Sequence, residues 1–204
     1  MKRILLFMLL ALVPFATLAA DAGLAMVQQR VAKVAVLRGE FAQEKRVAGF
    51  KNPLRSQGRF VLARDRGVVW TTLKPFPSEV VVTRERIYSV QRDGSRRVEL
   101  DGSRQPALRG VNQMMLALVA GDLQNLAARF DVQATTLPGQ GWKLSLTPKS
   151  AALAKAFARI DLQGDRYVRE ARIVEAGGDA TVLGFSALSE TPAQLSREEA
   201  ARLD

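Results

Sequence analysis

The amino-acid sequence predicts an α+β fold, in which one strongly curved, mostly antiparallel sheet of about ten strands forms an incomplete barrel with helices over its concave side. Alternating apolar and polar residues recur along most of the chain, between turn signals such as Asp65-Arg66-Gly67. Apolar residues at three- and four-residue steps occur before the strands and again in their middle. A third observation concerns the segment 58–77, whose predicted strands are apolar on both faces.

The two apolar faces of the segment 58–77 both need a cover. Phe60 and Leu62 share one face and Val61 and Ala63 take the other, because side chains alternate along a strand. Large apolar faces are not left in water, and a few short helices do not fill the hollow of a wide sheet. We therefore expect part of the lining to be reserved for an apolar ligand. The alternative is that the helices and the sheet's own side chains close the core completely.

Residues 1–20 have the pattern of a secretory signal peptide. Lys2 and Arg3 precede an apolar run that starts at Ile4, and small residues follow it. The alternative is a membrane anchor, but Pro14 interrupts the run, which is shorter than the ~20 apolar residues of a spanning helix. We expect cleavage near residues 19–22 and an exported mature chain.

The composition excludes most hydrolase chemistry. The chain has no histidine, which removes the usual general base and the usual zinc ligand, and it has no cysteine for a disulfide or a lipid anchor. No nucleophile-elbow or phosphate-loop motif occurs, and the spacing of the 20 acidic residues singles out no carboxylate pair. The sequence therefore predicts neither an enzyme nor a metal or cofactor site.

The charge balance is basic, with 30 Lys and Arg against 20 Asp and Glu. Seven arginines lie in one predicted stretch of strands and turns, at Arg84, Arg86, Arg92, Arg96, Arg97, Arg104 and Arg109. They are either a solvated rim or a docking surface for an acidic partner or anionic headgroups. Nucleic acid is not an expected partner, because Tyr88 is the only aromatic residue of the stretch.

In the first half of the chain, the spacing predicts one helix and then a run of strands. The apolar residues of the helix are Leu24, Val27, Val31, Val34 and Leu37, and Gly39 ends it. Strands are expected over 40–49, 56–64, 68–74, 79–84 and 87–92. A shorter strand contains Val98 and Leu100.

In the second half, two short helices interrupt the strands. The first has an apolar stripe at Val111, Met114, Met115, Leu118 and Val119. Gly121 ends it, and Asp122 caps the second. Strands follow over 131–137, 141–149, 157–163, 166–175 and 180–188. Ser196 and Glu199 have the spacing of a capping box, which predicts a short helix in the C-terminal tail.

Several segments in this order together resemble the LolA family of periplasmic carriers, which take lipoproteins from the inner to the outer membrane. They are FAQEKR (41–46), GRFVLARDRGVVW (58–70), KPFPSEVVV (74–82), RIYSVQ (86–91), LVAGDLQNLAARF (118–130) and GWKLSLTPK (141–149). The resemblance covers Leu24 to about Leu188 and implies an incomplete barrel whose apolar cavity has a helical lid. It divides the chain into the signal peptide 1–20, the LolA-like domain 21–190 and the charged tail 191–204.

The resemblance also implies a site. Arg64 falls on the family's arginine that holds the closed lid through backbone carbonyls; the alternative is a solvated strand-end residue beside Asp65. The expected cavity lining is Phe60, Leu62, Val68, Trp70, Val80, Val82, Met114, Met115 and Leu118. Each of these can instead be a core residue, Trp70 most readily. The implied partners are an acylated lipoprotein or lipid cargo, a donor transporter in the inner membrane and an acceptor receptor in the outer membrane, with the carrier a monomer.

Two features depart from the family pattern: the charged, helix-like tail after the last strand and the arginine excess. They leave open a LolA-like branch that carries another lipid, such as an aryl-polyene or a glycolipid. A periplasmic sensor module similar to RseB is a further alternative, although such proteins usually add a second domain, for which the chain has no room.

Overall fold

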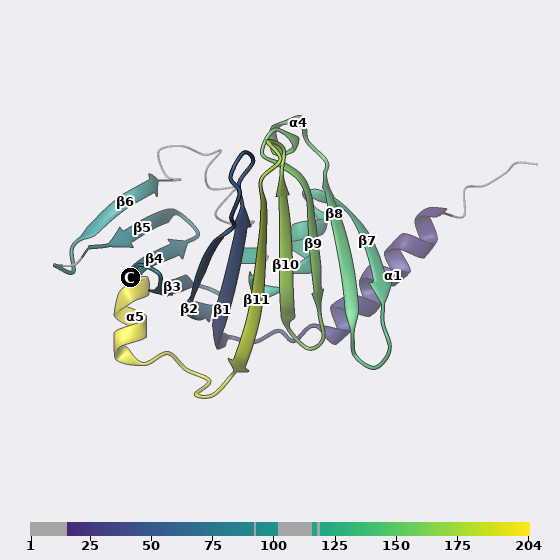
Figure 1. Cartoon of the computed structure of the whole chain (residues 1–204). Helices are drawn as coiled ribbons and strands as arrows, with labels where there is room; N and C mark the ends of the chain where they lie inside the picture. Colours follow the sequence, from purple (N-terminus) through teal and green to yellow (C-terminus); the bar gives the residue numbers. More distant parts are fainter. Residues whose placement is uncertain (1–15, 92, 102–115, 118) are drawn as a thin grey trace, which may run out of the picture.

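A single antiparallel sheet of 11 strands organises the molecule, in the order β6-β5-β4-β3-β2-β1-β11-β10-β9-β8-β7 (Figure 1). This computed structural model describes residues 16–91, 93–101, 116–117 and 119–204. The strands are β1 (Val36–Arg46), β2 (Leu54–Ala63), β3 (Gly67–Lys74), β4 (Ser78–Thr83), β5 (Arg86–Val90), β6 (Arg96–Asp101), β7 (Phe130–Thr136), β8 (Trp142–Pro148), β9 (Phe157–Gly164), β10 (Val168–Glu175) and β11 (Ala180–Ser189). Since β6 and β7 do not pair with each other, the sheet stays open, which confirms the predicted incomplete barrel.

The helices that accompany the sheet include α1 (Ala16–Arg30), α3 (Leu123–Ala127), α4 (Ala151–Ala154) and α5 (Arg197–Leu203). In Figure 1 the strands β3 to β6 turn away from the upright β1 and β8 to β11, and α1 crosses β7. Val27 of α1 and Leu126 of α3 are fully buried in the main core, so both helices cover its concave face. In the part of the chain that is described, no helix is long and apolar enough to cross a membrane.

The predicted first helix is wrong at its end. It stops at Arg30, and the residues from Val36 on form β1. The backbone N–H of Ala32 donates to the carbonyl of Arg166 at 2.8 Å, which takes the chain out of the helix and toward the sheet. Val34 and Leu37 still reach the same apolar core as Val27, so their spacing did not distinguish a helix from an extended segment.

Gly39 also has a different role from the predicted one. It lies inside β1, opposite Phe60 of β2. A Cβ atom at this position would stand 2.5 Å from Cδ2 of Leu188 and 2.9 Å from the ring of Phe60. The glycine therefore permits close packing in the strand and does not end a helix.

The predicted helix boundary at Gly121 and Asp122 is confirmed. Gly121 has a φ of +61°, a conformation that favours glycine after a helix. The Asp122 side chain accepts a hydrogen bond from the backbone N–H of Asn125 at 3.2 Å and so caps α3. Of the apolar stripe predicted before Gly121, Val119 is described and half-buried, and the other four residues lie outside the described part of the chain.

The second apolar face of the segment 58–77 is covered by the chain's own C-terminus. Ala63, Val69, Val81 and Tyr88 form a separate buried cluster with Leu203 of α5. The predicted capping box of this helix is present, with reciprocal hydrogen bonds between Ser196 and Glu199. The two apolar faces of this segment therefore have different covers. The concave face packs against the cluster that contains α1 and α3, and the convex face packs against α5.

Candidate functional site

The concave face brings six of the predicted lining residues together. Strand register places Phe60 opposite Trp70 and Leu62 opposite Val68, so their side chains point to the same side. Four of the six are buried at 1–5% exposure and two are half-buried, all in one cluster: Phe60, Leu62, Val68 and Val82, then Trp70 and Val80. Met114, Met115 and Leu118, the other three predicted residues, lie outside the described part of the chain.

Aromatic rings form the centre of this face. Trp70 stacks on Phe41 with ring centroids 3.9 Å apart, and Phe60 and Phe185 complete the group. The sequence prediction missed Phe41 and Phe185 as lining residues. Their alternation within β1 and β11 placed each on one face, but only the pairing of Phe41 with Phe185 across the sheet shows that both face the hollow.

A helical cover lies over the concave face. We define it as α1 and α3 together with residues 116–117 and 119–120. Val27, Ala117 and Leu126 from these segments are at most 4% exposed in the same cluster as the lining. Among the described residues the lining is thus packed against the cover, as in the closed-core alternative.

Arg64 joins the sheet to the helical cover at Ala120 and to the segment that follows α1. Its Nε donates to the carbonyl of Val34 at 3.0 Å, and its Nη2 lies 3.5 Å from the carbonyl of Ala32, in the segment after α1. The same Nη2 donates to the carbonyl of Ala120 at 3.2 Å, directly before Gly121. The guanidinium therefore binds backbone carbonyls of the cover and of the segment after α1, and it is not a solvated strand-end side chain.

Space remains beside this guanidinium. A hollow of about 320 Å³ is lined by Arg64, Arg84, Leu116, Ala117, Asp122 and Asn125. A smaller one, of about 60 Å³, lies between Arg64, the end of α1 and the start of α3. Arg64 and Asp122 line both hollows, so there is open space on two sides of the contact between Arg64 and the cover.

The convex face carries a denser ionic contact between sheet and helix. Arg38 of β1 forms a two-bond ion pair with Glu199 of α5, each bond 2.7 Å long. The Arg38 guanidinium holds the pKa of the Glu199 carboxyl at about 2, well below its usual range. Arg38 also donates to the carbonyls of Pro192 and Gln194, and so fixes the loop before the helix.

Three further side chains bind the C-terminal end of α5. Arg66 donates to the carbonyl of Ala200 at 3.3 Å, Arg96 donates to the carbonyl of Ala201 at 2.7 Å, and the Tyr88 hydroxyl donates to the carbonyl of Arg202. Cations at this end also complement the helix dipole. No local sequence pattern had indicated that arginines would bind the carbonyls at the end of α5.

The described arginines of the stretch 84–109 all have partners within the molecule. Arg96 binds α5, and the others form ion pairs: Arg84 with Asp65, Arg86 with Asp101 and Arg97 with Glu99. Arg92, Arg104 and Arg109 lie outside the described residues. The docking surface considered for this stretch is therefore in part a set of internal contacts.

Comparisons with known proteins agree with this architecture. A family model for outer membrane lipoprotein carrier proteins, LolA-like, matches residues 16–201. An outer-membrane lipoprotein carrier protein of Xanthomonas axonopodis pv. citri is 28% identical over 159 residues, which are 77% of this chain and 73% of the relative. Among solved structures, MucB matches with a TM-score of 0.50 at 14% identity, over 89% of this chain and 62% of MucB. A LolA superfamily protein of Nitrosomonas europaea matches with a TM-score of 0.46 at 11% identity, over 83% of this chain and 92% of that protein.

Proposed function

Because this chain belongs to the LolA-like family of outer membrane lipoprotein carriers, we propose that it is a periplasmic carrier. It shields the acyl chains of a lipoprotein, or of a related lipid, against its concave face and carries them from the inner to the outer membrane. In this proposal residues 1–20 are removed on export, residues 21–190 form the carrier domain, and the tail 191–204 completes it. The carrier acts as a monomer and catalyses no reaction.

The observation that carries the proposal is that Arg64 binds both the helical cover, at Ala120, and the segment that leads from α1 into β1, at Val34. A cover held only by apolar contacts would trap an acylated cargo, because each buried CH₂ stabilises the loaded state by about 0.8 kcal/mol. Charged hydrogen bonds of about 1.5–3 kcal/mol each favour the closed, empty state and so oppose loading. Arg64 acts as the latch whose re-formation helps release the cargo.

The cargo contacts would be the side chains that the cover now packs against: Phe60, Leu62, Val68, Trp70, Val80 and Val82, with Phe41 and Phe185 beside them. Met114, Met115 and Leu118 remain part of the proposed lining. An inner-membrane transporter loads the carrier, and an outer-membrane receptor unloads it. Each partner would dock before the cover opens, so that the acyl chains pass between the two proteins without entering water.

The test is to recover the protein from the periplasm and extract it with organic solvent for mass spectrometry. Arg64→Met keeps the apolar part of the side chain and removes the guanidinium. We expect this variant to copurify with several-fold more acyl chains than the wild type. Arg64→Lys should lie between them. Arg159→Met is the matched control, since Arg159 is an exposed arginine that pairs with Asp161 on the face of β9 opposite the buried Ile160.

Two outcomes would contradict the proposal. One is an absence of acyl chains from both the wild type and Arg64→Met; the other is an equal load in Arg64→Met and Arg159→Met. The masses also decide between cargo classes, because lipoprotein acyl chains arrive attached to a peptide, whereas an aryl-polyene or a glycolipid does not. A sensor module would retain a membrane-protein partner and no lipid.

A further inference from the structure

One end of the sheet exposes an unusual number of large apolar side chains. Among the described residues, six such side chains are prominently exposed, and four of them lie at this end: Phe50 at 69%, Leu54 at 56%, Leu73 at 50% and Phe76 at 81%. Two of these are aromatic rings at the tips of connections. Burial of such rings is favourable, so a surface that keeps several of them exposed is a candidate for a contact.

The strand topology places these four residues at the same end. Phe50 lies in the connection between β1 and β2, and Phe76 lies in the connection between β3 and β4. Because β1, β2, β3 and β4 form an antiparallel meander, both connections lie opposite the turn between β2 and β3. Leu54 opens β2 and Leu73 precedes the last residue of β3.

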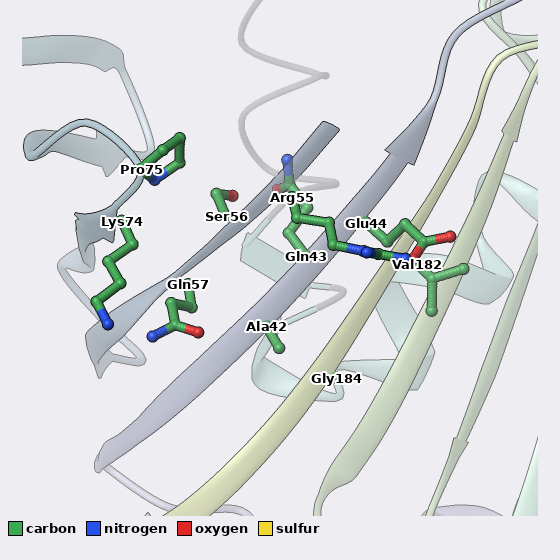
Figure 2. A pocket seen from close by; sticks show the side chains of 10 residues that line it. All are labelled: Ala42, Gln43, Glu44, Arg55, Ser56, Gln57, Lys74, Pro75, Val182 and Gly184. Atoms are coloured by element: carbon green, nitrogen blue, oxygen red, sulfur yellow. Dashed lines mark hydrogen bonds and ion pairs between the residues drawn. The ribbon is translucent and has the colours of Figure 1, made fainter. Parts of the chain in front are cut away.

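A hollow lies between the two connections, on the convex side (Figure 2). It has a volume of about 660 Å³ and is lined by the ends of β1, β2 and β3 and by β11. Ala42 and Gly184 give it a floor without long side chains. Figure 2 shows Lys74 and Pro75 on one side of the hollow and Arg55 and Glu44 on the other.

The charge of this end is positive. Its acidic residues already have basic partners: Glu44 contacts both Arg46 and Arg55, and Lys45 contacts Glu175 and Asp179. Lys51 and Lys74 are exposed, and no carboxylate of the described part of the chain lies within ion-pair distance of either. The end therefore combines exposed aromatic rings with lysines that have no acidic partner.

We propose that this end, which we call the basic rim (Phe50, Lys51, Leu54, Leu73, Lys74 and Phe76), docks on an anionic phospholipid surface. Aromatic rings favour the depth of the headgroups, and lysines are attracted to the negative charge of the headgroup phosphates. Arg55 and Lys74 would bring a phosphate into the hollow between them. The inference adds a membrane contact to the proposed carrier and does not depend on the concave face.

Co-sedimentation of the mature chain with phospholipid vesicles tests the proposal. The wild type should bind vesicles of phosphatidylglycerol and phosphatidylethanolamine, bind phosphatidylcholine vesicles at least tenfold more weakly, and dissociate as salt is added. The variants Phe50→Ser with Phe76→Ser, and Lys51→Glu with Lys74→Glu, should each lose binding at least fivefold. All four positions are exposed, so these variants should unfold at the same urea concentration as the wild type.

The controls carry the same chemical changes elsewhere. Val98→Ser removes an exposed apolar side chain from β6, and Lys143→Glu with Lys155→Glu makes the same charge change on other exposed lysines. Wild-type protein that stays in the supernatant, or controls that lose as much binding as the rim variants, would overturn the proposal. So would rim variants that keep vesicle binding but no longer take cargo from inner-membrane vesicles, because a protein partner would then occupy the rim.

The two proposals fail separately. Arg64→Met should bind anionic vesicles as the wild type does, and the rim variants should bind a fluorescent fatty-acid probe in solution as the wild type does. Loss of probe binding in all proteins would remove the carrier function and leave the vesicle result standing. If vesicle binding changes in Arg64→Met but not in the rim variants, the membrane contact lies at the opened cover and the rim proposal is wrong.

Discussion

The two faces of the strands β2 to β5 are both covered by helices, but the covers are attached in different ways. On the concave face the attachment is apolar packing plus side chains that donate to backbone carbonyls: Arg64 to Val34 and Ala120, Arg30 of α1 to Leu137 and Gly141, and Lys149 to Ala127 of α3. On the convex face α5 is attached by Leu203, by the ion pair of Arg38 with Glu199 and by side-chain donors at its C-terminal end.

The two attachments differ in how much it costs to break them, and this difference indicates which cover opens more easily. Opening the concave cover frees backbone carbonyls that water can then bind, whereas separating Arg38 from Glu199 exposes two charges that are about four-fifths buried. For α5 to leave, the ion pair of Arg38 with Glu199 must break together with the hydrogen bonds that Arg66, Arg96 and Tyr88 donate to the end of the helix. We therefore interpret the concave cover as the mobile element and α5 as a fixed part of the fold.

The largest expected effect on stability comes from removing α5. Deletion of residues 195–204 takes away Leu195 and Leu203 and exposes Val69 and Val81. We expect the free energy of unfolding to fall by about 3–5 kcal/mol, the usual effect of losing two large buried side chains. Urea denaturation followed by circular dichroism measures it. A loss below about 1 kcal/mol would mean that α5 is only loosely attached.

The next effect concerns the concave cover. Arg64→Met should lower the free energy for opening α1 and α3 by about 1.5–3 kcal/mol, because the contacts to Val34 and Ala120 are lost. Hydrogen exchange measured by mass spectrometry should show faster exchange in these helices and unchanged exchange in α5. Equal acceleration on both faces would show that the two covers are coupled.

A smaller effect comes from the ion pair. Glu199→Gln should cost about 1–2 kcal/mol at pH 7, because the pair is only partly exposed. Glu198→Gln is the control, since the Glu198 side chain is 78% exposed, and its effect should stay below about 0.5 kcal/mol.

The ion pair also predicts a pH dependence. A carboxyl whose pKa is lowered to about 2 on folding stabilises the protein above its unfolded pKa of 4.5, and that contribution is lost as the pH falls toward 2. The difference in urea midpoint between wild type and Glu199→Gln should therefore be constant from pH 7 to 5 and shrink below. A difference that stays constant down to pH 2.5 would contradict the cause given for the pKa.

The smallest change is at the helix cap. Ser196→Ala removes the acceptor for the Glu199 backbone N–H and should cost about 1 kcal/mol. Ser150→Ala in α4, whose capping bond to Leu153 is 3.3 Å long, provides a comparison at a helix that buries no side chain. Its effect on the urea midpoint should be smaller than that of Ser196→Ala.

Local patterns accounted for much of the fold. Alternation placed the strands within a few residues, Gly121 and Asp122 marked a helix boundary, and Ser196 with Glu199 marked a helix start. Each of these signals depends on residues no more than four positions apart, so a single sequence contains them. The first helix was placed too long because Val34 and Leu37 are apolar in either conformation, and a bond to Arg166 decides between them.

Local periodicity was enough to predict where side chains alternate along strands, the order of those strands in the chain, and the need to cover both faces of residues 58–77. Which segment covers which face could be learned from the folded structure alone. That choice depends on contacts between distant residues, such as Arg38 with Glu199, 161 positions apart, and Arg64 with Ala120, 56 positions apart. Periodicity shows that a side chain needs a partner, but the partner is selected by packing and hydrogen bonding once the whole sheet has formed.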